Sequence, residues 1–209
     1  MTTETEICNI ALGYLGARRI TSFDVEEDST EWLLCNENYA NLRDAVLEER
    51  EWTFAVKRVD LDPSTTEIVF GFERLFTKPT DSVRILTVHD DSVIRPSPIT
   101  TPQPVSRGVH DLPQLEGWQV EGDFILANAE LIHVRYNRRV TQTGSFSATF
   151  IQALAQRMAA EFSLPLTESR SLFDKMWASY ASKIVMGGVS DGMQGRSRKV
   201  RSQALIRRR

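Results

Sequence analysis

Few side chains in this sequence have the types and spacing that catalysis or metal binding requires. His89-Asp90-Asp91 offers the ligand types of a metal corner, but we interpret it as a polar turn between two strands. His110 lies beside a Pro-rich stretch and His133 on a predicted strand face, and we interpret both as solvent or interface residues rather than general bases. The sequence contains no Gly-rich phosphate loop, no nucleophile elbow and no Cys or His pair at zinc spacing. We therefore predict a protein that is not an enzyme and that holds no cofactor or metal.

The acidic and thiol side chains also have simpler explanations than catalysis. Glu48, Glu49 and Glu51 are close together in the sequence, but a run of charge at the end of a helix is usually a solvated face. Cys8 and Cys35 both fall within apolar helical patterns, which favours reduced thiols in the core over a disulfide or a metal site.

The most informative polar feature is the C-terminal end. Residues 196–209 hold seven Lys or Arg residues and no acid, so the preceding 195 residues hold 18 basic and 28 acidic residues, a formal charge of −10. Such a tail could neutralise nucleic-acid phosphates, although no aromatic residues are interleaved for base stacking. It could instead fold on a partner protein, with its Arg residues on acidic groups and Val200, Leu205 and Ile206 in small pockets. The third possibility is an unstructured tail that keeps the protein soluble.

The N-terminal part of the chain predicts two helices. The first spans residues 6–15 and stops at Gly16, with a buried stripe formed by Ile7, Ile10, Ala11, Tyr14 and Leu15. The second begins at Asp28, a predicted N-cap that Glu31 reciprocates. Its predicted buried face consists of Trp32, Cys35, Tyr39, Leu42 and Val46, and its predicted solvent face of Glu37, Arg43, Glu48 and Arg50. We expect the chain to leave this helix extended, with Trp52 and Phe54 entering the core.

The middle of the chain has the short apolar runs and turn residues of an antiparallel sheet or small barrel. The predicted strands are 67–72, 83–88, 92–95, 118–121, 124–127 and 131–136. Glu121-Gly122-Asp123 has the residues of a hairpin turn, and the strand at 131–136 alternates between an apolar and a polar face. The Pro-rich stretch 95–105 is expected to form a long exposed loop.

Helical periodicity returns near the C-terminus. Ile151, Leu154, Ala155, Met158 and Phe162 form the face of a third helix, which we expect to stop near Pro165. Thr167 is the predicted cap of a fourth helix, which ends at Gly187-Gly188 and has a buried face formed by Leu172, Phe173, Met176, Trp177, Tyr180 and Ile184. The predicted fold class is α+β, a four-helix bundle (1–58 and 141–187) with an inserted antiparallel β domain (59–140) and an extended, flexible basic C-terminal arm (188–209).

Composition sets limits on location. The 209 residues are 41% hydrophobic and 25% charged, which suits a chain that can bury a core. No run of about 18 apolar residues is present for a membrane span, and the first residues lack the features of a signal peptide. We therefore expect a protein made in the cytosol, without a membrane as a partner.

Several segments together resemble the tail tubular protein A family, the head-to-tail adaptors of short-tailed, podovirus-type bacteriophages. The resemblance begins with Ile10-Ala11-Leu12-Gly13-Tyr14-Leu15-Gly16-Ala17 and Ile20-Thr21-Ser22-Phe23. It continues through residues 43–55, which end in Trp-Thr-Phe-Ala, and through 77–84, Tyr136-Asn137-Arg138-Arg139, 150–164 and the fourth helix. It covers about residues 5–187, and the order and spacing of the pieces are more specific than any single piece.

The resemblance implies a non-enzymatic virion protein at the head-tail interface, made in the host bacterium. It implies a ring, twelvefold in the family, beneath the portal, with the nozzle protein (tail tubular protein B type) below and a channel through which genomic DNA passes. The family also implies that the C-terminal arm grips the portal. The residues implied for that role are Arg196, Arg198, Lys199, Val200, Arg201, Leu205, Ile206, Arg207, Arg208 and Arg209.

The charge distribution fits this role, because an acidic channel wall lets a DNA duplex slide where a basic one would hold it. The alternative is a DNA-binding packaging accessory protein that uses the basic tail. A cell-wall hydrolase carried on the tail would need a pair of carboxylates in a cleft, for which the sequence gives no position.

Overall fold

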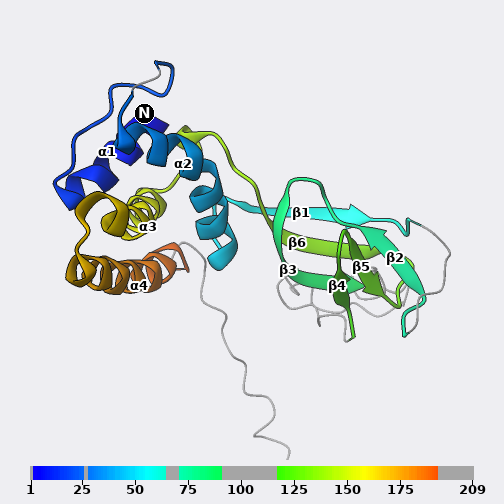
Figure 1. Cartoon of the computed structure of the whole chain (residues 1–209). Helices are drawn as coiled ribbons and strands as arrows, with labels where there is room; N and C mark the ends of the chain where they lie inside the picture. The colour runs from blue at the N-terminus through cyan, green and yellow to red at the C-terminus, as the bar shows by residue number, and fades with distance from the viewer. Residues whose placement is uncertain (1, 26–27, 65–70, 91–116, 193–209) are drawn as a thin grey trace, which may run out of the picture.

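A computed structural model describes residues 2–25, 28–64, 71–90 and 117–192 of the chain. It contains both α and β structure, as predicted. The helices are α1 (Glu4–Leu15), α2 (Thr30–Glu49), α3 (Ala148–Thr167) and α4 (Arg170–Gly192), with a short 3-10 helix at Thr143–Ser145. The strands are β1 (Val56–Leu61), β2 (Arg74–Thr77), β3 (Ser82–Asp90), β4 (Gln119–Glu121), β5 (Phe124–Ala127) and β6 (Ile132–Arg138). The helices gather on one side of the molecule and the strands on the other (Figure 1).

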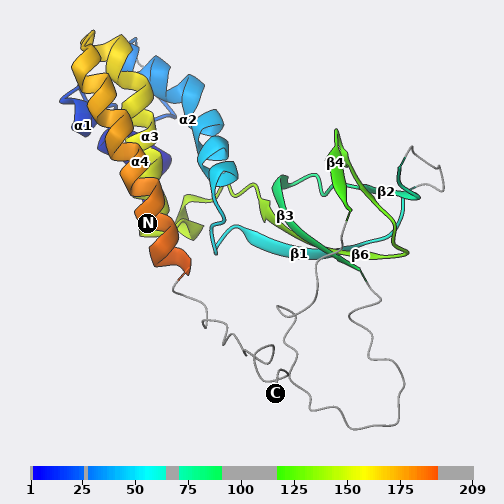
Figure 2. The same cartoon turned by 90° about the horizontal axis from the view of Figure 1, so that it is seen from below.

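The strands form two antiparallel sheets of three, with the orders β1-β6-β3 and β2-β5-β4. The sheets lie in two layers (Figure 2) that enclose a core of their own, which includes Phe76, Ile125, Val134 and Tyr136. The predicted hairpin turn at 121–123 is confirmed, since Gly122 joins β4 to β5 with a φ of 55°, a conformation that glycine adopts without strain. Along β6 the predicted alternation also holds, with Ile132, Val134 and Tyr136 buried.

The four helices share a separate and larger core. Trp32, Cys35, Tyr39, Leu42 and Val46 of α2 are all buried, as their spacing predicts. Met176, Tyr180 and Ile184 form the buried face of α4. The helices and the strands are joined where the C-terminal end of α2 reaches the β1-β6-β3 sheet, because the chain passes directly from α2 through a turn into β1 (Figures 1 and 2).

Local predictions about the first two helices need correction. The cap of α2 is Ser29, whose Oγ accepts a hydrogen bond from Trp32 N at 3.2 Å, so the prediction of Asp28 is wrong by one residue. A capping box of Thr3 and Glu6 starts α1 earlier than expected, while Gly16 ends it in the left-handed conformation as predicted. The buried stripe of α1 is Ile7, Cys8, Ala11 and Leu12, whereas Ile10 and Tyr14 are exposed.

The predicted solvent face of α2 is wrong at Arg43, which is only 7% exposed. Its guanidinium donates a hydrogen bond from Nε to Asp44 Oδ1 at 2.9 Å, and Asp44 also pairs with Arg139 Nε at 2.7 Å. This shared carboxylate compensates the buried charge. The chain after α2 is also different from expectation, because residues 53–55 form a turn instead of an extended segment, although Trp52 is buried and Phe54 packs on the same core.

Of three predictions about the last helices, one is confirmed and two are wrong. The third helix ends near Pro165 as predicted, since Pro165 lies in the last turn of α3, which ends at Thr167 with Glu168 in the left-handed conformation. The fourth helix is capped by Ser169, whose Oγ accepts from Leu172 N at 3.4 Å, because Thr167 still belongs to α3. Gly187 does not end α4, which continues to Gly192 into the predicted arm.

Among the strands, β3, β4, β5 and β6 match predicted runs within a few residues, while β1 and β2 were not expected. Of the predicted strand 67–72, only Gly71 and Phe72 are described, and they precede β2 as a turn and an isolated bridge. The predicted strand 92–95 and the Pro-rich stretch 95–105 lie outside the described residues.

Candidate functional site: the α2 joint and the C-terminal end of α4

All ten residues predicted to bind a portal lie between Arg196 and Arg209, outside the described part of the chain. The nearest described structure is the C-terminal end of α4, from which that segment continues. This end of α4 is held by a side chain at the C-terminal end of α2, where helices and sheet meet.

Two side chains from the β1-β6-β3 sheet donate hydrogen bonds to the last carbonyl oxygens of α2. Asn137 of β6 is fully buried, and its Nδ2 donates to Leu47 O at 2.9 Å and to Arg50 O at 2.5 Å. Arg84 of β3 donates to Glu48 O at 3.1 Å and to Glu49 O at 3.3 Å. The final carbonyls of a helix have no partner within the helix, so the sheet supplies the partners that α2 lacks.

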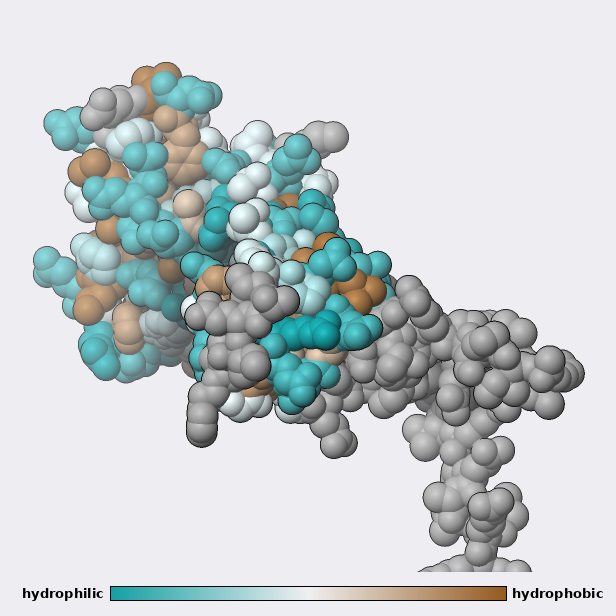
Figure 3. Space-filling view, turned by 90° about the vertical axis from the view of Figure 1, so that its right-hand side faces the viewer, coloured by the Kyte–Doolittle hydropathy of each residue, from teal (hydrophilic) through white to brown (hydrophobic). Residues whose placement is uncertain are grey.

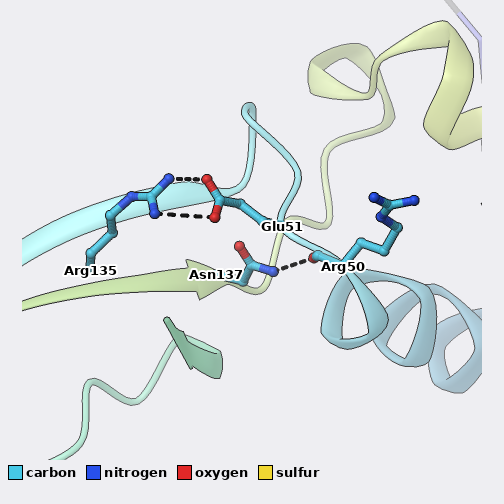
Figure 4. A network of polar contacts seen from close by, with 4 residues as sticks. All are labelled: Arg50, Glu51, Arg135 and Asn137. Carbon is cyan, nitrogen blue, oxygen red and sulfur yellow. Dashed lines mark hydrogen bonds and ion pairs between the residues drawn. The ribbon is translucent and has the colours of Figure 1, made fainter. Parts of the chain in front are cut away.

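A charged pair joins the same two elements. Arg135 of β6 faces Glu51 with both terminal nitrogens, one of them at 3.1 Å from Glu51 Oε2 (Figure 4). Burial lowers the pKa of the Arg135 guanidinium from its ordinary value. The two-pronged geometry suits the planar guanidinium and fixes direction as well as distance. Glu51 is therefore bound to the sheet and is not part of a free acidic run.

The C-terminal end of α2 also holds α4. The Arg50 guanidinium, which points away from the sheet in Figure 4, donates from Nη1 to Ile184 O and, at 3.0 Å, to Val185 O. The Tyr180 hydroxyl donates to the Glu49 carboxylate, and burial, together with this hydrogen bond, raises the pKa of Tyr180 above its ordinary value. Glu49 and Glu51 are both exposed, as predicted for a run of charge at a helix end, but each also binds a neighbouring element, Glu49 to α4 and Glu51 to the sheet.

Trp52 fills the space beneath α4. Its indole Nε1 donates to Val46 O at 2.8 Å, and its ring meets Phe150 edge-on at 5.1 Å. Gly187 lies directly over this ring, because a Cβ added there would stand 3.2 Å from Trp52 Cη2. The glycine that we expected to end α4 therefore allows the helix to approach the indole closely.

Another polar cluster, formed by Asp81, Lys57 and Tyr136, lies at the start of β3. Asp81 accepts hydrogen bonds from Lys57 Nζ at 2.9 Å and from the Tyr136 hydroxyl at 2.8 Å. Burial of this carboxyl opposes its ionisation, but the hydrogen bonds from Lys57 and Tyr136 outweigh burial and hold the pKa of Asp81 below its ordinary value. The cluster ties β1, β6 and the β3 entry together.

The outer side of the α3-α4 pair carries a groove of about 520 Å³. The described residues that line it are Thr149, Gln152, Ser179, Ser182, Lys183, Met186 and Gly187. The groove therefore lies beside the anchored end of α4, since Gly187, which packs against Trp52, is part of its lining.

The histidines and cysteines that the structure describes lie apart from the C-terminal ends of α2 and α4. His133 lies on a strand face as predicted, with its Nδ1 2.6 Å from Asp60 Oδ1. His89 lies within β3, opposite His133, so the prediction that His89 belongs to a turn is wrong. His110 lies outside the described residues. Cys8 and Cys35 are buried free thiols, and the hydrogen bond between them, together with burial, raises the pKa of Cys8. Within the described ranges no group of three or more His, Cys, Asp or Glu residues is arranged to hold a metal ion.

The residues that build the joint are mostly ones that sequence patterns do not single out. Asn137 and Arg135 lie on a strand whose alternation predicts only which residues face the core. Their partners are more than 80 positions away in the sequence. These residues are recognised only because a buried amide lies next to a helix end. That observation needs the folded structure and cannot be made from the sequence.

The surface that faces the viewer in Figure 3, on the strand side of the molecule, is largely hydrophilic, and its apolar residues form small separate groups. In the described part of the chain, no helix has the length and apolar character to span a membrane. No protein-family model and no curated protein matches the sequence.

Proposed function

We propose that this chain is a structural head-to-tail adaptor of a short-tailed bacteriophage, located in the virion at the head-tail interface. In this proposal it acts without catalysis, as a subunit of a ring, twelvefold by resemblance. The ring binds the portal above and the nozzle protein below, and leaves a channel for DNA. The observation that carries the proposal is the ordered resemblance of residues 5–187 to the tail tubular protein A family.

The finer organisation belongs to the same proposal. We interpret the four helices as a bundle, the strands as a domain inserted between α2 and α3, and the residues after α4 as an arm. The separate apolar cores of the helices and of the strands support the division into two parts. The joint at α2 supports a rigid connection between them, since Asn137, Arg84 and Arg135 of the sheet all bind the end of one helix.

Anchoring of α4 supports the proposed arm. An arm that transmits a load to a partner needs a fixed base, and the last turns of α4 are held by Arg50 through two carbonyls and by Trp52 beneath Gly187. The opposed charges of the two parts, −10 for residues 1–195 and +7 for residues 196–209, allow the arm to bind an acidic partner surface while the body repels DNA.

Deletion of residues 196–209 tests the role of the arm. We expect the truncated protein to keep its circular dichroism spectrum and unfolding temperature, and to lose the complex with the portal. Light scattering should give the mass of each protein alone and of the mixture, at low and moderate salt. A chain of the same length in which the seven basic residues are replaced by Gln separates the effect of charge from that of length. Unchanged portal binding by the truncated protein would show that the arm hypothesis is wrong.

The alternative function makes a different prediction in the same samples. A DNA-binding packaging protein should bind duplex DNA with an affinity that falls steeply as salt rises, and the deletion should abolish this binding. An adaptor should form a large complex of defined stoichiometry with the portal and bind DNA weakly. Strong DNA binding by a protein that ignores the portal would favour the alternative.

A further inference from the structure

The groove on the α3-α4 pair differs chemically from the rest of the acidic body. Its described lining contains two serines, a threonine, a glutamine and one cation, Lys183, but no carboxylate. Within the described residues Lys183 forms no ion pair with an acid, and its ammonium lies over the Tyr14 ring at 5.8 Å from the centroid. A cation that faces a groove without a compensating acid leaves its charge available to a ligand.

The lining residues of α4 form a row along the helix. Ser179, Ser182, Lys183 and Met186 follow the spacing of one helical face, and they extend over roughly 10 Å at the rise of an α-helix. That length matches about three residues of an extended chain. The row offers hydroxyl groups that donate or accept hydrogen bonds, a positive charge, and the exposed thioether of Met186, which is 67% accessible.

We propose that this groove binds an acidic, extended segment of the partner protein on which the C-terminal arm docks. The inference deepens the proposed function, and rests on it for the presence of a protein partner beside the end of α4. Two independent features select the same partner chemistry. The groove presents Lys183 without a carboxylate, and residues 196–209, which follow α4 in the sequence, carry seven positive charges, so both parts complement an acidic surface.

Other occupants fit the groove less well. The chain's own C-terminal segment has the same sign of charge as Lys183 and would be repelled by it. Duplex DNA carries far more negative charge than a short acidic segment, so the acidic body opposes the close approach of DNA more strongly. A second copy of this chain would have to present one of its acidic segments, and this possibility appears as a separate outcome of the test.

The test uses the full-length chain with methyl-labelled methionine, observed by NMR. The sequence has five methionines, of which Met186 lines the groove, Met158 and Met176 are buried in the helical core, and Met193 lies in the C-terminal segment. Met186→Leu assigns the groove signal. The probes are a short peptide of alternating glutamate and alanine, a matching lysine–alanine peptide, and a duplex DNA oligonucleotide.

We expect the glutamate peptide to shift the Met186 signal in a saturable way and to leave the Met158 and Met176 signals in place. Lys183→Glu should weaken this binding about fivefold to tenfold, because it replaces an attraction with a repulsion. Lys175→Glu makes the same charge change on an exposed residue two turns earlier in α4, outside the groove, and should change the affinity by less than about twofold. Unshifted core methyl signals in both variants report an intact fold.

Three results would overturn the inference. The first is a glutamate peptide that shifts only Met193, since the basic tail alone would then account for binding. The second is a Met186 shift caused by DNA rather than by the peptide. The third is a Met186 signal that moves on dilution without any probe, which would assign the groove to a second copy. None of these results depends on a portal, so failure here remains distinct from failure of the docking experiment above.

Discussion

Replacement of Asn137 by alanine should destabilise the protein by about 0.5–3.5 kcal/mol. The Nδ2 group donates to two carbonyls, Leu47 O of α2 in a buried position and Arg50 O, just after the helix, in a partly buried one. Loss of the partner of a buried acceptor costs about 1–3 kcal/mol, and loss of the partly buried bond costs about 0.5–1.5 kcal/mol because water can replace it in part. Among the described residues Asn137 Oδ1 has no partner, so its removal returns about 1 kcal/mol.

Urea and thermal unfolding, followed by circular dichroism, measure this loss. For a chain of this size each kcal/mol lowers the unfolding temperature by roughly 2–4 °C, so we expect a decrease of roughly 1–14 °C. Asn137→Leu fills the space that alanine leaves empty, but it also leaves both carbonyls unpaired. It should therefore remain clearly less stable than the natural chain. If Asn137→Leu is as stable as the natural chain, the two carbonyls do not depend on the amide and the reasoning is refuted.

Asn38→Ala is the matched control. Asn38 Nδ2 also donates to a backbone carbonyl, Leu34 O, at the same 2.9 Å, but it does so within α2. That carbonyl is already bonded in the helix, and alanine favours the helical conformation. We therefore expect a change of less than about 0.5 kcal/mol. An equal loss in Asn38→Ala and Asn137→Ala would mean that the effect comes from the lost amide itself rather than from the helix end.

Two further predictions follow from single contacts. Gly187→Ala gains about 1 kcal/mol of helix propensity. The new Cβ would, however, lie 3.2 Å from the buried Trp52 ring, and this overpacking costs about 1–3 kcal/mol. Urea unfolding should therefore show a net loss of stability. Gly13→Ala has no atom within 4 Å of the new Cβ and should instead gain about 0.5–1 kcal/mol, and a gain of that size at both positions would refute the close packing of Gly187. The pKa of Asp81 is lowered in the folded state, so its contribution is present at neutral pH and is lost as pH falls below the ordinary carboxyl pKa. Asp81→Asn should accordingly lower the unfolding temperature at pH 7 and have a smaller effect in acid, whereas an effect that does not change with pH would contradict the linkage.

Helical periodicity predicts the buried face of α2 well, since all five apolar residues at alternating steps of three and four are buried. It predicts α1 poorly, since Ile7, Cys8, Ile10, Leu12 and Tyr14 give apolar side chains on almost every side. Packing against α3 then selects the face that contains Cys8 and Leu12. A helix of this composition fits two orientations, and only its neighbours decide between them.

Strand β1 shows a different limit. Its sequence, Val-Lys-Arg-Val-Asp-Leu, carries three charges in six residues and lacks a strict alternation. It lies at the edge of its sheet, and all six side chains remain at least partly exposed. An edge strand gains its stability from pairing with β6 rather than from burial of its own side chains, so the apolar pattern that identifies internal strands is weak there.

The connection between the helices and the sheet explains why polar side chains gather at the C-terminal end of α2. Since α2 passes directly into the sheet, its last carbonyls lie at the junction of two apolar regions, where water satisfies them only in part. An apolar side chain at position 137 would leave the buried Leu47 carbonyl unpaired, so the sheet presents a donor there, whereas the carbonyls that Arg84 contacts are exposed and can also bond to water. Arg50 likewise donates hydrogen bonds to backbone carbonyls of α4, those of Ile184 and Val185. A movement of the sheet relative to the helices would therefore have to break bonds to α2, whose end also holds the base of the C-terminal segment.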